Sequence, residues 1–161
     1  MVLVFRDVSE KYEREKQITE NERKYRGLFN SIRDAILVTD TDRNIIDCNS
    51  AFSDVFGYSL EDIRGKKTVS VYKNEDEYTQ MGKALREYKG DQASFLFTVN
   101  YKRKDGTIFP GETNVFYLRD DEGKVTGFIG LIRDITARRN MEEVLEQSTN
   151  RYKRLVDNSP N

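Results

Sequence analysis

The stretch DCNSAFSDVFGYSLEDIRGK, residues 47–66, decides the fold because it contains the starts and ends of two short helices. A capping residue stands before each apolar run, and a glycine follows each run. These signals are Asn49 or Ser50 as the first cap, Ser59 with Asp62 as an S-x-x-D capping box, and Gly57 and Gly65 as the two ends.

Strand patterns precede this stretch and a longer helix follows it. AILVT at 35–39 and IIDCN at 45–49 predict two strands joined by the polar turn DTDRN at 40–44. KNEDEYTQMGKALREYKG at 73–90 predicts a helix that Asn74 caps, with acidic residues in its first turn as the helix dipole favours.

The last third of the chain predicts a meander of three antiparallel strands. Apolar side chains alternate along 94–103, and Asp105-Gly106 makes a turn into 107–119. A second turn, DDEG, leads into the final strand at 124–136.

That final strand is apolar on both faces, with Phe128 and Ile132 on one and Ile129 and Leu131 on the other. Such a strand needs cover on both sides of the sheet. The short helices cover one side, so we expect either the leading helix or a partner chain on the other.

One pattern occurs twice in the chain. RD at 6–7 aligns with RD at 133–134, and Tyr25 aligns at the same offset with Tyr152. An internal period this long is typical of whole domains in tandem.

Both copies lead into segments that predict helices with a narrow 4-3 apolar stripe. A shared stripe favours a parallel homodimer in which the helices pair, although a single amphipathic helix lying on its own domain is the alternative. The dimer seam would comprise Ile18, Asn21, Tyr25, Leu28 and Ile32 in the first helix, and Met141, Leu145, Ser148, Tyr152 and Leu155 in the second.

Composition limits the kinds of partner. The net charge is −1, from 27 basic and 28 acidic residues, so we expect no nucleic-acid partner. No apolar run approaches the length of about 20 residues that spans a bilayer, so we expect no direct membrane contact. The single Cys48 suits a reducing compartment and predicts a cytoplasmic location, with any membrane anchor elsewhere in a longer parent.

No catalytic or metal-binding constellation is present. The chain has no His, which excludes a Ser-His-Asp triad, an HExxH zinc site and a His-bound haem. DTDRN resembles the start of an EF-hand loop but has Ile45 and Ala51 where Gly and Glu are required, so we interpret it as a hairpin turn. Cys48 is expected to be a small buried residue, and we predict a non-catalytic chain with no metal site.

The order of these elements resembles the PAS fold. The likeness rests on residues 47–66 and on YKRKDGTIFPGETNVFYLRDDEGKVTGFIGLIRDITARR at 101–139, which is similar to the C-terminal PAC motif of the family. It implies an α+β fold: a five-stranded antiparallel sheet with short helices on one face, flanked by coiled-coil-type helices at both ends.

The resemblance also divides the chain. We expect the last strand of a preceding PAS domain at 1–9, a helical coiled-coil linker at 10–29, the PAS domain with its PAC motif at 30–136, a helical linker at 137–155, and the start of a following PAS domain at 156–161.

The function implied is a sensory, signal-relay and dimerisation module of a larger signalling protein, such as a sensor histidine kinase or a cyclic-di-nucleotide enzyme. Asp134 and Thr136, with Arg133, would couple the last strand to the outgoing helix. The alternative is a small-molecule sensor with its ligand between sheet and helices.

Ligands of PAS domains occupy that cleft. No cofactor is expected: haem through His is excluded, and flavin–cysteinyl photochemistry is disfavoured because Cys48 lies on a strand, although a small ligand stays open. The candidate cleft residues are Val38, Phe52, Phe56, Val71, Met81, Leu85, Phe95, Phe97, Val99, Val115, Tyr117, Phe128 and Ile132.

Overall fold

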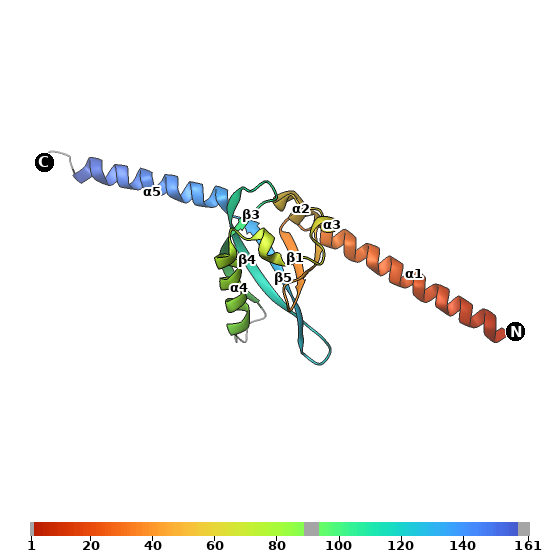
Figure 1. The fold of residues 1–161 in the computed structure, drawn as a ribbon. Helices are drawn as coiled ribbons and strands as arrows, with labels where there is room; N and C mark the ends of the chain where they lie inside the picture. The colour runs from red at the N-terminus through yellow and green to blue at the C-terminus, as the bar shows by residue number, and fades with distance from the viewer. Residues whose placement is uncertain (1, 89–93, 158–161) are drawn as a thin grey trace.

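A computed structural model describes residues 2–88 and 94–157. Its elements form an α+β arrangement, in which a group of short helices separates the first two strands from the last three (Figure 1). In chain order they are α1 (Val2–Ser31), β1 (Ala35–Asp40), β2 (Ile45–Cys48), α2 (Ser50–Phe56), α3 (Leu60–Ile63), the 3-10 helix η1 (Thr68–Val71), α4 (Glu75–Glu87), β3 (Ser94–Lys102), β4 (Ile108–Arg119), β5 (Val125–Asp134) and α5 (Thr136–Asp157).

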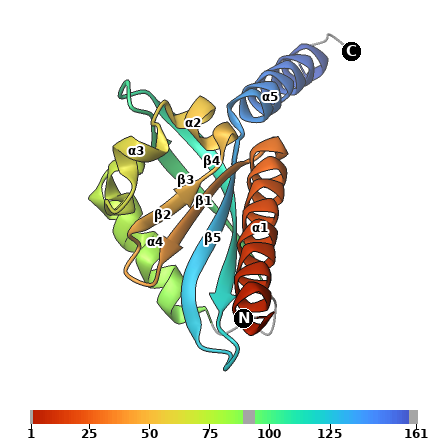
Figure 2. The same ribbon diagram turned by 90° about the vertical axis from the view of Figure 1, so that its right-hand side faces the viewer.

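The strands form a five-stranded sheet in the order β2-β1-β5-β4-β3. Every neighbouring pair is antiparallel, including β1 with β5, which brings the two ends of the domain together at the centre of the sheet. Figure 2 shows α3 and α4 on one side of the sheet. This architecture confirms the predicted fold class.

The helix caps are those that the sequence predicts. The Asn49 side chain caps α2, the Ser59–Asp62 capping box starts α3, and the Asn74 side chain accepts the Glu77 N–H at 2.9 Å at the start of α4. Gly57 follows α2 in the left-handed region, at φ 82°, which Gly adopts without the steric cost of a Cβ. The local signals therefore fix where α2, α3 and α4 begin, and these helices make up the helical layer of the domain.

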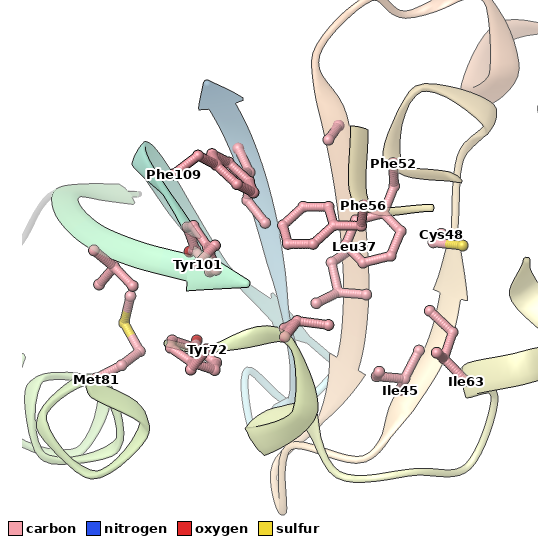
Figure 3. Close-up of a cluster of buried hydrophobic side chains, with 14 residues drawn as sticks. Leu37, Ile45, Cys48, Phe52, Phe56, Ile63, Tyr72, Met81, Tyr101 and Phe109 are labelled. Carbon is pink, nitrogen blue, oxygen red and sulfur yellow. The ribbon is translucent and has the colours of Figure 1, made fainter. Parts of the chain in front are cut away.

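The core lies between the sheet and this helical layer (Figure 3). Phe52 and Phe56 of α2 stack at 4.3 Å, and the Phe56 ring meets the edges or faces of Tyr101 and Phe109 from the sheet. All four rings are at most 2% exposed. Aromatic contacts at these distances stabilise a core beyond the area they bury.

The leading helix does not cover the outer face of the sheet. Figure 1 shows α1 and α5 extending away from the domain in opposite directions. Ile129 and Leu131 on the outer face of β5 are only half-buried, and every α1 residue from Asp7 to Tyr25 is exposed. The two expectations that placed the first helix on its own domain are therefore wrong, and cover by a partner chain stays a prediction.

The strand expected at 1–9 is also wrong, because α1 begins at Val2. A strand needs hydrogen-bonding neighbours, and no strand in the described part of the chain pairs with this segment, whereas a helix satisfies its backbone groups internally. At the other end α5 continues through 156–157, and the remainder of the segment assigned to a following domain, 158–161, lies outside the described residues.

Candidate functional site

The exit from the sheet into α5 is held by Asp134, the last residue of β5. Its carboxylate accepts the Thr136 N–H at 2.9 Å and the Thr136 hydroxyl at 2.5 Å. Thr136 is the first residue of α5, so Asp134 binds an N–H that the helix itself leaves without a partner. The predicted coupling pair is therefore in direct contact at the junction.

Arg103, which the sequence did not single out, links this junction to the helical layer. Its guanidinium donates to the Asp134 carboxylate at 2.7 Å and to the Val55 carbonyl of α2 at 2.6 Å, and it lies 4.2 Å from the centre of the Phe109 ring. Burial raises the pKa of Asp134, but the hydrogen bonds from Thr136 and Arg103 outweigh burial and hold that pKa below its usual value. The carboxylate is therefore ionised at neutral pH.

Asn49 organises the entrance to the domain. The side chain is 1% exposed; its oxygen accepts the N–H groups of Ile36 and Phe52, and its amide donates to the carbonyls of Phe29 and Asp34 at 3.2 and 3.0 Å. One side chain thus joins the end of α1, the start of β1 and the start of α2. Removing the Asn49 side chain would leave several buried backbone groups without a hydrogen-bond partner.

Two ion pairs also tie the entrance to the sheet. Arg26 of α1 makes a two-pronged contact with Asp47 of β2 at 2.9 and 3.0 Å, which raises the pKa of Arg26. Arg133, the third predicted coupling residue, reaches away from Asp134 to Asp34 at 3.2 Å, and its side chain is 63% exposed. It therefore bridges exit and entrance on the surface rather than joining the junction itself.

All the predicted cleft residues except Val38 fall into three groups. Phe52, Phe56, Val71 and Val99 are sealed in the packed core, at most 2% exposed. Phe95, Phe97 and Tyr117 are half-buried in a neighbouring aromatic group, in which the Tyr117 hydroxyl donates to the Leu85 carbonyl. The group that lines an internal cavity comprises Met81, Leu85, Val115, Phe128 and Ile132.

The prediction for Val38 is wrong, because this residue does not lie on the face of the sheet that lines the core and the cavity. The residues of β1 that enter the core or line the cavity are Ala35, Leu37 and Thr39, and neighbouring side chains of a strand point to opposite faces. β1 is apolar on both faces, so hydrophobicity alone could not distinguish them.

The cavity has a volume of about 50 Å³, and its polar lining was missed from the sequence. Thr39, Arg43, Thr68 and Thr113 face it together with the two tyrosines Tyr72 and Tyr101. Burial raises the pKa of both tyrosines, and it raises the pKa of Tyr101 well above the ordinary value. The Arg43 charge opposes the rise in the pKa of Tyr72. The Tyr101 hydroxyl oxygen lies 2.5 Å from that of Thr113. The phenols are therefore neutral at neutral pH.

Other candidate sites lack the chemistry that they would need. The Asp40 carboxylate accepts hydrogen bonds from the backbone of Asp42 and Asn44, as in a hairpin turn. Cys48 is buried, as predicted, and burial raises the pKa of its thiol. Within residues 2–88 and 94–157 no cluster of His, Cys, Asp and Glu is arranged to hold a metal ion, and no helix is long and apolar enough to cross a membrane.

The predicted dimer seam lies on the surface of both long helices. Its apolar members are 42–69% exposed, and Asn21 and Ser148 are exposed as well. These apolar members are Ile18, Tyr25 and Leu28 of α1, Ile32 just after the end of α1, and Met141, Leu145, Tyr152 and Leu155 of α5.

Comparison with known proteins agrees with this geometry. A family model described as PAS fold matches residues 23–135. The chain belongs to the PAS family. PAS domains are typically non-catalytic sensory modules, and the match runs from the last turns of α1 to the residue before α5.

Relatives of this PAS domain occur within longer signalling proteins. It is 28% identical over 156 residues to sporulation kinase C of Bacillus subtilis and 29% identical over 143 residues to sensor protein kinase WalK of Staphylococcus aureus. Those matches cover 91% and 88% of this chain but only 36% and 22% of the relatives. The PAS domain of an HTR-like protein from Haloarcula marismortui shares the fold, with a TM-score of 0.66, 23% identity, and coverage of 77% of this chain and 99% of that one.

Proposed function

We propose that this PAS domain is a signal-relay module of a larger signalling protein, in which movement of the sheet passes through Asp134 and Thr136 into α5. The observation that carries the proposal is the direct contact of these residues at a junction without Gly or Pro. Arg103 extends that contact to α2, so a shift of the helical layer reaches the same carboxylate. A junction of this kind has no flexible joint to absorb a small rotation.

A chimera tests the relay. This chain would replace the matching region of sporulation kinase C, and kinase activity would be measured for Asp134→Asn, which keeps the shape but removes the charge. We expect activity to change several-fold. The matched control is Asp157→Asn at the far end of α5, which should leave activity as it was. Equal activity in the unmodified chimera and the Asp134→Asn variant would contradict the relay.

The module acts, in this proposal, as a parallel homodimer. Support comes from the exposed stripes of α1 and α5 and from the half-buried outer face of β5. Exposed apolar stripes of this kind favour association. A second copy is the favoured partner because both helices carry the stripe in the same 4-3 register, as pairing of like helices requires.

Sedimentation tests the dimer. Ile18→Asp with Leu28→Asp should shift the protein from dimer towards monomer, because each change puts a charge into the seam. Ser9→Asp with Thr19→Asp adds the same charge on the opposite side of α1 and should leave the dimer intact. A wild-type protein that sediments as a monomer at tens of micromolar would exclude a stable homodimer.

We further propose that the module is non-catalytic and cytoplasmic, that it lies between other PAS domains, and that it carries no tightly bound chromophore. The second candidate function is a small-molecule sensor, which the internal cavity favours. Absorbance and native mass spectrometry of the purified protein separate these options. A stoichiometric visible band contradicts the absence of a chromophore, and an added small mass favours the sensor.

A further inference from the structure

Arg43 enters the interior from an unusual backbone position. It lies in the turn between β1 and β2 with φ 65°, the left-handed region that residues other than Gly seldom occupy. Its N–H donates to the Asp40 carbonyl at 3.1 Å, and its carbonyl accepts the Thr68 N–H at 3.1 Å. The turn is thus tied to η1 and directs a charged side chain inward, at 9% exposure.

The protein provides a specific place for this guanidinium. Nη1 donates to the Tyr78 carbonyl of α4 at 2.7 Å, and the group lies 3.7 Å from the centre of the Tyr78 ring and 5.2 Å from that of Tyr72. Gly82 provides the space for the guanidinium, because a Cβ at this position would lie only 2.9 Å from Nη1. These contacts hold Nη1, whereas Nη2 makes no hydrogen bond; the guanidinium also lies close enough to the Tyr72 phenol to oppose the rise in the pKa of that group.

Two buried donors at this place have no partner. Arg43 Nη2 and the Thr68 hydroxyl are both inaccessible, both lack a hydrogen bond, and both residues line the same cavity; Ser70, which has the same property, does not line it. No described residue forms a salt bridge with Arg43. A buried charge without an anion is costly, and a buried donor without an acceptor adds to that cost. A negatively charged hydrogen-bond acceptor bound in the cavity would satisfy both donors.

The rest of the cavity wall is mostly apolar. Leu37, Met81, Val115 and Ile132 line it. Gly130 also lines it and leaves space beside the backbone, where a Cβ would meet nothing closer than 3.6 Å. A volume of about 50 Å³ holds a few waters or a molecule of about four to six non-hydrogen atoms. The ligand that fits is small, with one charged end and one apolar end.

We propose that this cavity binds a short-chain monocarboxylate, whose carboxylate accepts hydrogen bonds from Arg43 Nη2 and the Thr68 hydroxyl while its alkyl end packs on the apolar wall. The proposal rests on the second candidate function and gives that sensor its ligand class. A surface depression between the β1–β2 turn and α4 shares Arg43, Leu85 and Phe128 with the cavity, and a ligand would enter past these three side chains.

Calorimetry and thermal unfolding with propionate test the proposal. Propionate at up to about 10 mM should bind and raise the melting temperature by mass action. Propionamide, which has the same shape without the charge, and inorganic phosphate, which lacks the apolar end, should not. Equal responses to propionate and propionamide, or no response to propionate, would overturn it.

Three variants locate the binding. Arg43→Met should weaken propionate binding at least about tenfold, because a charge-assisted hydrogen bond is lost. Thr68→Val should weaken it less, about three- to tenfold. Lys83→Met removes one positive charge from the exposed side of α4 and should change nothing. An Arg43→Met variant that binds as well as the wild type contradicts the site.

Gly130→Val keeps the test decisive even if Arg43→Met does not fold. It adds apolar volume at the cavity wall while leaving both donors in place, and a Cβ at this position meets only ordinary contacts. This variant should fold and lose the response to propionate, whereas an undiminished response contradicts the site. A negative result with propionate does not bear on the relay proposal, because the chimera experiment tests Asp134 and not the cavity. Binding of a different small molecule would support the sensor function and contradict only the proposal that the ligand is a carboxylate.

Discussion

The two ends of this PAS domain are held by different kinds of contact. At the entrance, Asn49 is 1% exposed and joins α1, β1 and α2 through neutral hydrogen bonds. At the exit, Asp134 and Arg103 each have side chains that are 28% exposed, and the contact is a charged pair that water reaches. Buried polar groups cannot exchange their partners for water, whereas partly exposed ion pairs can. The entrance is therefore a fixed anchor, and the exit is the end that can change.

Asn49→Ala should produce the largest effect. It removes a side chain that satisfies several buried groups, and we expect a loss of about 3 kcal/mol in the free energy of unfolding, measured with urea. Asn30→Ala is the control, because that exposed side chain accepts one hydrogen bond, from the Ser50 N–H. Comparable losses for the two variants would mean that the entrance is not a buried anchor.

Asp134→Ala should cost about 1 kcal/mol, the usual loss when a helix start loses its side-chain acceptor. Circular dichroism should show that α5 loses helix at its first turns while the sheet remains. A loss as large as that of Asn49→Ala would erase the distinction between the two ends.

Acid should weaken the exit specifically. The pKa of Asp134 is below its usual value, so the stability it contributes is present above the ordinary carboxyl pKa and is lost as pH falls through the lowered one. The urea midpoint should therefore fall below about pH 4. Asp134→Asn should flatten that part of the profile, and an unchanged profile would mean that other carboxylates dominate.

Arg133→Gln should have the smallest effect. The Arg133–Asp34 pair is exposed, and such pairs contribute about 0–1 kcal/mol. We expect the urea midpoint to change little and the difference to vanish in high salt. A loss above 1 kcal/mol that persists in high salt would show that this surface bridge is part of the anchor.

The local features of the fold could be predicted from the sequence, because caps and strand alternation act within a few residues. Ser59 and Asn74 are predicted as caps on that basis and Asn49 is one of two candidates with Ser50; Asn49, Ser59 and Asn74 each cap a helix. What could not be predicted depends on tertiary contacts. Val38 was placed on the wrong face because β1 is apolar on both faces, and the strand expected at 1–9 is helical.

The polar part of the cavity was missed for a related reason. Arg43 lies in a turn that looks exposed in sequence, and only its left-handed backbone and the space at Gly82 bring it inside. Arg103 was missed because its partners, Val55 and Asp134, are distant in the chain. A charged residue beside a turn gives no sign in the local sequence of which distant residues it will contact.

The most direct test of the central claim, that the exit passes rotation into α5, is a series of insertions after Arg139 in the sporulation kinase C chimera. One added residue rotates the following stripe by about 100°, whereas seven nearly restore its phase. Kinase activity should therefore change with one inserted residue and return with seven. Equal activity with one and with seven inserted residues would contradict the claim and leave α5 as a tether.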